Sequence, residues 1–228
     1  EVQTFVAMNS EAQRNKRSGA ERLYSQGLAQ LSRDDYQRAL PFFERASEAD
    51  PNYAEAWYQA GYCFGALGRH TEALRASRQA AKLRPDWSAT YINIGVSSYA
   101  LGSYKDAADA YRQALRIEEN DAETRYLLGT ALGKLNRTDE EILEYRRTLT
   151  LKPDHSQAIE KLGLALFKLK RFGEAATAFE QLRSYKPDAK TYNYLGESLL
   201  ETNKPDEAID ALNTALGYDS EFAKARFN

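Results

Sequence analysis

The stretch that decides the fold is residues 54–87, which read AEAWYQAGYCFGALGRHTEALRASRQAAKLRPDW. Two of its small residues, Gly61 and Ala73, allow two helices to approach each other closely. Gly68 lies between the two expected helices, where a left-handed residue commonly ends the first of them. Pro85 ends the second helix, because proline cannot continue the hydrogen-bond ladder. The stretch therefore predicts a pair of short helices joined by a tight turn.

The same pattern recurs along the chain with a period of 34 residues, shortened once to 33. The recurring glycines are Gly27, Gly61, Gly95, Gly129, Gly163 and Gly196. Twelve residues after each glycine stand Ala39, Ala73, Ala107, Glu141, Ala175 and Ala208, and sixteen residues after each stand Phe43, Ser77, Tyr111, Tyr145, Phe179 and Leu212. Prolines follow four of the glycines at Pro51, Pro85, Pro153 and Pro187. A fixed period of this length is typical of stacked structural repeats, each of which buries its apolar face against its neighbours.

Trp57, Gly61, Ala73, Ala80 and Pro85 make this pattern resemble the tetratricopeptide repeat family. The resemblance covers residues 20–222 as six repeats: 20–53, 54–87, 88–121, 122–155, 156–188 and 189–222. It implies an all-α, right-handed superhelical solenoid of helix-turn-helix repeats, with a concave surface lined by the first helix of each repeat. The chain departs from the family pattern at Ser77, Glu119, Glu141 and Ser220. At these positions the local packing need not follow that of the family, while the fold is expected to stay the same.

Composition narrows the classes of function. Of the 228 residues, 43% are hydrophobic and 28% are charged, which favours a soluble chain with no inserted membrane segment. The formal net charge of −2 gives no overall basic field, so we expect no nucleic-acid partner. No secretory segment is found, although the absence of an initiator Met is compatible with a leader that has been removed, and the compartment stays open.

Chemistry-bearing residues are few and scattered. The two histidines, His70 and His155, are about two and a half repeats apart, and neither has a nucleophile or metal-ligand pattern beside it. Cys63 stands where this family places small residues, so we interpret it as a packing residue. We therefore expect no catalytic site, no cofactor and no metal ion.

The resemblance instead implies a binding groove on the first helices. The residues placed there are Tyr24, Tyr58, Tyr62, Asn93, Tyr99, Tyr126, Lys161, Lys168, Lys190 and Tyr194. Tyrosine offers a large apolar face with a polar tip and few torsions to order, which suits peptide recognition. The first hypothesis is thus a non-catalytic scaffold that binds a peptide segment of a protein partner. The alternative for each tyrosine is packing between adjacent repeats.

The two ends suggest a second hypothesis. Residues 1–19 form an N-terminal arm or cap, helical or extended, with Gly19 as a hinge, and residues 223–228 form the start of a truncated or missing capping helix. Apolar residues at the ends are Val2, Phe5, Val6, Ile209, Leu212 and Leu216. If the last repeat is uncovered, these residues favour a structural subunit that assembles head-to-tail into a homo-oligomer or filament.

Overall fold

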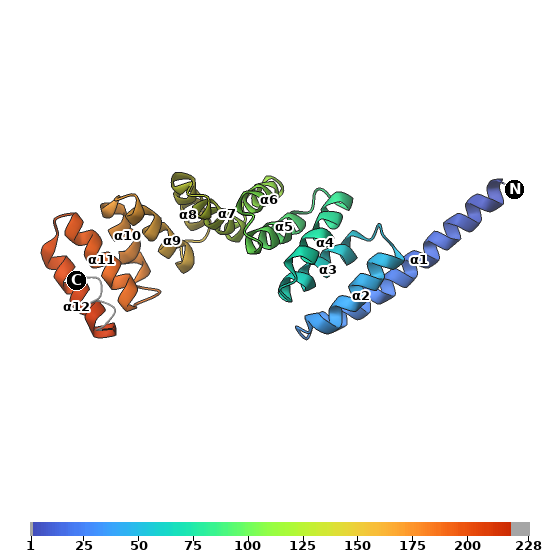
Figure 1. The fold of residues 1–228 in the computed structure, drawn as a ribbon, viewed down its shortest axis with the longest axis horizontal. Coiled ribbons are helices and arrows are strands. Elements are labelled where there is room, and N and C mark those ends of the chain that lie inside the picture. The colour runs from blue at the N-terminus through green and yellow to red at the C-terminus, as the bar shows by residue number, and fades with distance from the viewer. Residues whose placement is uncertain (1, 220–228) are drawn as a thin grey trace. The chain divides into compact units, whose positions relative to one another are not determined.

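The computed structural model describes the backbone of residues 2–219 and the side chains of residues 15–219. Over this range the chain forms twelve α-helices and no strand (Figure 1). They are α1 (Val2–Leu31), α2 (Tyr36–Ala49), α3 (Ala54–Ala66), α4 (His70–Leu83), α5 (Ser88–Ala100), α6 (Tyr104–Ile117), α7 (Ala122–Lys134), α8 (Thr138–Leu151), α9 (Ser156–Lys168), α10 (Phe172–Leu182), α11 (Ala189–Glu201) and α12 (Pro205–Tyr218). The prediction of an all-α repeat solenoid is confirmed.

The helices pair into hairpins, because a glycine on the first helix leaves room for a bulky side chain on the second. A Cβ atom added to Gly27, Gly95 or Gly129 would collide with the ring of the residue sixteen positions later. Those rings belong to Phe43, Tyr111 and Tyr145, which are the largest fully buried side chains together with Phe179. In residues 54–87, Gly61 faces the hydroxyl of Ser77 instead, so this hairpin closes around a small residue.

Left-handed residues end the first helix of each hairpin. The backbone angle φ is positive at Gly68, as the sequence predicts, and at Gly102, Asn136 and Asn203 in the corresponding turns. It is also positive at Asp34 and Lys170, which occupy the same place in their hairpins and are not glycine or asparagine. The turn geometry is therefore imposed by the hairpin and is kept even where the residue type does not favour it.

Helix boundaries follow from proline and from side-chain caps. α2, α4, α8 and α10 all end shortly before a proline. The carboxylates of Asp121 and Asp188 accept hydrogen bonds from backbone N–H groups in the first turns of α7 and α11. Pro41 lies inside α2, which continues past it.

The chain divides into two compact units, residues 1–119 and residues 120–228. In the N-terminal unit, α2 packs on α3 and α4 packs on α5, so consecutive hairpins stack. In the C-terminal unit, α8 packs on α9 and α10 packs on α11 in the same way. Each unit has its own apolar core, with Phe43 and Phe64 in the first and Tyr145 and Phe179 in the second.

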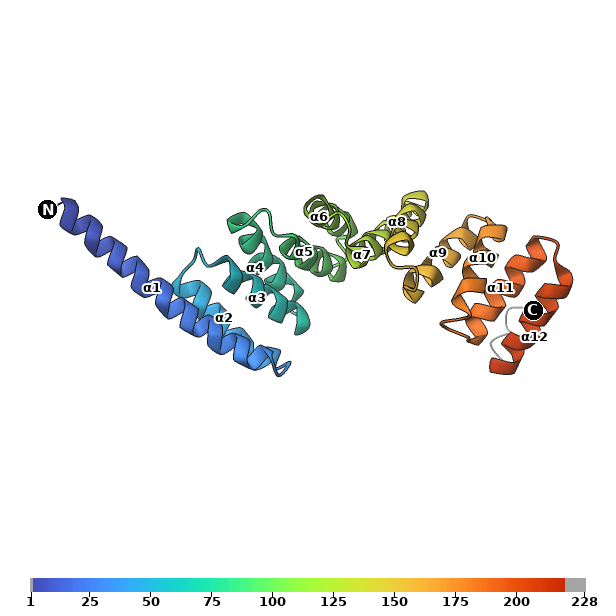
Figure 2. The same cartoon turned by 180° about the vertical axis from the view of Figure 1, so that it is seen from behind.

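The N-terminal segment is helical. α1 runs for 30 residues without a break at Gly19, so residues 2–19 extend the first helix of the first hairpin. Figure 2 shows this extension continuing past the end of α2 in a straight line. Neither the hinge at Gly19 nor a cap that folds back is found, because regular helix hydrogen bonding continues from one segment into the other. The side chains of residues 1–14 lie outside the described part.

No helix within the described residues is both long enough and apolar enough to cross a membrane.

Candidate functional site

All ten residues predicted for the groove lie on the first helices of the hairpins. Five belong to the N-terminal unit, and we call them the N-terminal face: Tyr24, Tyr58, Tyr62, Asn93 and Tyr99 on α1, α3 and α5. The other five form the C-terminal face: Tyr126, Lys161, Lys168, Lys190 and Tyr194 on α7, α9 and α11. The structure thus assigns the predicted residues to two separate compact units.

Three of the tyrosines form the joints between consecutive hairpins. Each contacts the ring of the residue 29 positions later, which is the N-cap of the next first helix. The pairs are Tyr24 with Tyr53 at 5.1 Å between ring centroids, Tyr58 with Trp87 at 4.4 Å, and Tyr126 with His155 at 4.8 Å. All three tyrosines are half-buried. These three tyrosines therefore pack between adjacent repeats, which is the alternative to peptide binding that the sequence left open. Sequence reasoning missed the aromatic residues that close each repeat, although their spacing was visible.

Tyr194 and Tyr99 also have ring partners. Tyr194 stacks on Phe179 at 5.2 Å with an angle of 10° between the planes, and it meets Phe167 edge-on. Tyr99 meets Tyr104 edge-on across the turn between α5 and α6. Tyr194 thus belongs to the core of the C-terminal unit, while Tyr99 packs against the start of the helix that follows its own.

The N-terminal face exposes an apolar row that the rings do not cover. Leu28, Tyr62 and Val96 occupy the same position on α1, α3 and α5, and their side chains are 37%, 42% and 42% exposed. Asn93 precedes Val96 by three residues, so the two lie on one side of α5. The Nδ2 atom of Asn93 is buried and has no hydrogen-bond partner among the described residues. This face therefore offers apolar surface, with an unpaired amide donor buried beside it.

The lysines of the C-terminal face are engaged locally. The Nζ atom of Lys190 donates to Glu160 Oε1 at 2.6 Å, and Lys186 donates to the other oxygen of the same carboxylate at 2.9 Å. Burial alone would raise the pKa of Glu160, but the bonds from Lys190 and Lys186 outweigh it and lower that pKa. The Nζ atom of Lys168 donates to the Asn136 side chain at 3.3 Å. Lys190 and Lys186 thus share one carboxylate, whereas Lys168 bonds a neutral amide.

Glu141 stands where the other hairpins have alanine, and it fills a notch beside Gly133. A Cβ atom on Gly133 would overlap the Glu141 carboxylate, so a larger residue there would make the carboxylate shift. Burial raises the pKa of Glu141, while a hydrogen bond with Tyr145 and the positive charges of Lys168 and Lys161 act in the opposite direction and are weaker. A carboxylate is thus held half-buried at a position suited to a methyl group.

Replacing Glu141 by alanine should raise the free energy of unfolding at pH 7 by about 1 kcal/mol, the usual gain from a consensus substitution. The folded protein binds a proton at Glu141 more tightly than the unfolded chain does, so the carboxylate lowers stability as the pH rises through its folded pKa. The gain should therefore shrink as the pH falls below that value. Urea unfolding at pH 7 and pH 4 measures both effects, with the exposed Asp210→Ala as control. A variant less stable than the parent at pH 7 would show that the bonds of the carboxylate outweigh its burial.

Cys63 and His155 are buried. Burial raises the pKa of the Cys63 thiol to about 11, so it stays protonated at neutral pH. The His155 ring is 4% exposed, caps α9 by accepting from the Ala158 N–H, and lies 3.2 Å from a Glu123 oxygen. No group of three or more histidine, cysteine or acidic side chains suited to a metal ion occurs among the described residues.

The residues proposed for self-association have different environments. Ile209 on α12 is 54% exposed and Leu216 is half-buried, but Leu212 is only 6% exposed because it fills the space beside Gly196. The expectation that Leu212 presents apolar surface is therefore wrong, since the joint of the last hairpin covers it. The side chains of Val2, Phe5 and Val6, and all of residues 223–228, lie outside the described residues.

Four family models match the chain, and each describes a tetratricopeptide repeat. They match residues 30–91, 95–136, 122–155 and 160–225. A curated relative, the uncharacterized protein MJ0572 of Methanocaldococcus jannaschii, is 35% identical over 54 residues, which are 24% of this chain and 63% of that protein. The chain therefore spans less than two thirds of the relative's length.

Solved structures with the same fold cover most of the chain. YrrB, described as a TPR protein with an unusual peptide-binding site, aligns with a TM-score of 0.73 at 21% identity over 81% of this chain and 96% of its own. PilF of Pseudomonas aeruginosa aligns with a TM-score of 0.73 at 15% identity over 93% and 98%. MamA of Desulfovibrio magneticus aligns with a TM-score of 0.69 at 22% identity over 73% and 94%. With the matched models and the stacked hairpins, these likenesses show that the chain belongs to the tetratricopeptide repeat family, whose fold generally serves as a non-catalytic scaffold for protein–protein interaction.

Proposed function

We propose that the N-terminal face binds a peptide segment of a protein partner. The observation that carries the proposal is the exposed apolar row of Leu28, Tyr62 and Val96, which recurs once in each first helix of the N-terminal unit. A scattered exposed leucine needs no explanation, whereas a periodic row along one face is typical of an interaction surface.

The chemistry of the face indicates what the segment looks like. Apolar side chains of the ligand would cover the row. The Nδ2 atom of Asn93 is buried in the unbound protein, so it would donate to a backbone carbonyl of the segment only after the Asn93 side chain turns outward. A buried donor without an acceptor costs free energy, and a ligand that supplies the acceptor recovers it. The fold of YrrB, a protein described as having a peptide-binding site, supports the proposal that this fold can bind a peptide.

Tyr62 is the best residue for a test, because its ring is the largest exposed group of the row. It touches Tyr36 of the preceding hairpin edge-on at 5.9 Å, but it is not one of the three tyrosines that pack on the N-cap of the next first helix. Tyr58 and Tyr126 are poorer choices, since their removal also takes away a joint between hairpins. The test variant is therefore Tyr62→Ser combined with Val96→Ser.

The experiment pans a display library of random twelve-residue peptides on the whole chain and measures the affinity of the selected peptides by fluorescence anisotropy. The test variant should lose at least about tenfold in affinity, because two apolar side chains leave the contact. Leu143→Ser with Leu151→Ser removes two equally exposed side chains from α8 and should leave the affinity within about twofold. Equal losses in the two variants, or no selected peptide, would contradict the proposal.

Self-assembly through the ends of the array is the second candidate. The observation that favours it is the exposure of Ile209 and Tyr218 on α12, at 54% and 55%. On this proposal the six repeats of residues 20–222 act as one array whose last helix contacts another copy. Ile209→Lys should then shift an oligomer to monomer in light scattering, and a parent chain that is monomeric at high concentration would rule the candidate out.

A further inference from the structure

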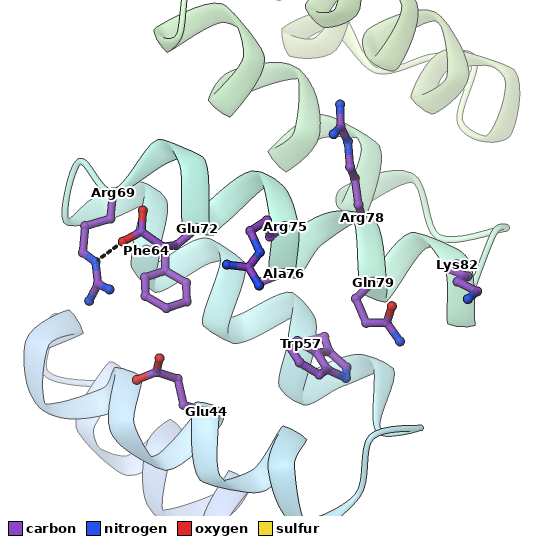
Figure 3. A pocket seen from close by; sticks show the side chains of 10 residues that line it. All are labelled: Glu44, Trp57, Phe64, Arg69, Glu72, Arg75, Ala76, Arg78, Gln79 and Lys82. Atoms are coloured by element: carbon purple, nitrogen blue, oxygen red, sulfur yellow. Dashed lines mark hydrogen bonds and ion pairs between the residues drawn. The ribbon is translucent and has the colours of Figure 1, made fainter.

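A cavity of about 630 Å³ opens on another side of the N-terminal unit, between α2 and α4 with α3 as its floor (Figure 3). The rings of Trp57 and Phe64 on α3 form the apolar part of its lining, and Glu44 reaches in from α2. None of the ten residues of the N-terminal and C-terminal faces lines it. Its volume lies within the range of sites that hold peptide side chains or small ligands.

Positive charge dominates the rim of this cavity. Four cationic side chains line it, Arg69, Arg75, Arg78 and Lys82, against the carboxylates of Glu44 and Glu72. Arg69 bonds Glu72 at 3.0 Å and lies over the Phe64 ring, so this pair is satisfied. The Glu72 carboxylate accepts hydrogen bonds from its own backbone N–H and from Arg69, and both lower its pKa. The carboxylate therefore stays charged and paired with Arg69.

The remaining cations have no such partner. Within the described residues no hydrogen bond or ion pair is formed by Arg75, Arg78 or Lys82, although Arg75 is close enough to Glu72 to be attracted by its charge. In Figure 3 Arg75 lies above the Trp57 ring, Lys82 lies at one end of the cavity, and Arg78 points away from α2. Unpaired cations beside an aromatic floor attract a ligand that carries both carboxylates and an apolar group.

The equivalent groove of the C-terminal unit serves as an internal comparison. Between α10 and α12 a smaller cavity of about 220 Å³ has a floor of Leu195 and Leu199, and its rim holds Glu180, Glu207 and Lys204. Lys204 is paired with Glu207 there. Both cavities lie between the second helices of two consecutive hairpins. The cavity on α3 has an aromatic floor and unpaired cations, whereas the cavity between α10 and α12 has an aliphatic floor and a paired lysine.

We propose that the cavity between α2 and α4 is a second docking site, which takes an acidic peptide segment with an aromatic side chain among its carboxylates. The aromatic side chain would lie on Trp57, and the flanking carboxylates would pair with Arg75 and Lys82. A groove bounded by two helices is a recurring place for such a segment. This site is independent of the one proposed on the N-terminal face.

The two tryptophans of the chain allow the sites to be told apart. Trp57 lines the cavity, whereas Trp87 contacts Tyr58 on the N-terminal face. The probe is the acetylated and amidated peptide Asp-Glu-Glu-Phe-Asp-Glu-Glu. In the Trp87→Phe variant, this probe should protect the remaining indole, that of Trp57, from quenching by acrylamide. In the Trp57→Phe variant, it should leave the quenching of Trp87 unchanged.

Matched variants test the charge and the floor. Arg75→Gln with Lys82→Gln should weaken binding of the probe by about tenfold, which corresponds to two exposed ion pairs. Arg22→Gln with Lys105→Gln removes the same charge from exposed positions of the same unit and should change affinity by less than about twofold. A probe with alanine in place of phenylalanine, and one with asparagine and glutamine in place of the acids, should each bind at least about tenfold more weakly.

Three results would overturn the proposal. The first is protection of Trp87 instead of Trp57, which would place the probe on the N-terminal face. The second is an equal loss in the two charge variants, which would indicate non-specific attraction. The third is full displacement of the probe by 10 mM inorganic phosphate with no effect of the phenylalanine, which would mark a simple anion site. None of these results bears on the library peptides that test the N-terminal face.

Discussion

Replacing Phe179 by alanine should lower the free energy of unfolding of the C-terminal unit by about 3–5 kcal/mol, the range for removing a buried aromatic ring. The ring is 1% exposed, sits beside Gly163 on α9 and stacks on Tyr194 of α11. It therefore joins three helices, and neighbouring hairpins cannot refill the space without moving apart. Urea unfolding measures the loss, and hydrogen exchange should place the faster exchange in α9, α10 and α11.

Tyr185→Ala provides the control for this experiment. Its side chain is 49% exposed in the same unit, so its removal should change stability by no more than about 0.5 kcal/mol. A loss below about 1 kcal/mol for Phe179→Ala would mean that the hairpin joint tolerates a cavity, and the packing argument for the glycine positions would then fail.

Gly95→Ala should destabilise the N-terminal unit by about 2 kcal/mol, although alanine is the better helix former. An added Cβ atom would lie within 3.0 Å of three atoms of the Tyr111 ring, which is 1% exposed and has no free space to move into. Overpacking of this kind costs about 1–3 kcal/mol beyond the helix propensity that alanine gains. Thermal unfolding followed by circular dichroism measures the result.

The matched substitution Gly65→Ala should have the opposite sign. Gly65 also lies in a first helix, but the nearest atom to its added Cβ is the Ala73 Cβ at 4.0 Å, an ordinary contact. The expected gain is about 0.5–1 kcal/mol from helix propensity and the smaller entropy of the unfolded chain. If both substitutions stabilise, the close approach of the hairpin helices does not explain the recurring glycines.

The candidate sites illustrate which features could be read from the sequence. The periodic residues placed Tyr62 and Asn93 on first helices, and the spacing could also have revealed Tyr53, Trp87 and His155 as ring partners. Which tyrosines stay exposed could not be predicted, because exposure depends on side chains contributed by the next hairpin. The bond between Lys190 and Glu160 could not be predicted for the same reason, since the two residues lie 30 positions apart in sequence.

The cavity on α3 was not predicted at all. Trp57 was recognised as a residue of the repeat pattern, which gave it a packing role, and Arg75 and Lys82 carried no motif. Only the packing of α2, α3 and α4 brings the ring and the two unpaired cations to one opening.

The sequence by itself determined the pairing of helices in each repeat, the turn at Gly68 and the assignment to a repeat family. These features depend on hydrogen bonds and steric limits within about 34 residues, and the same sequence pattern recurs in each repeat. The tertiary structure alone decided the position of the Glu141 carboxylate, the burial of Leu212 and the left-handed turns at Asp34 and Lys170. In each case the packed hairpin outweighs the preference of the single residue, because the free energy of the joint exceeds the cost of one unfavourable side chain or backbone angle.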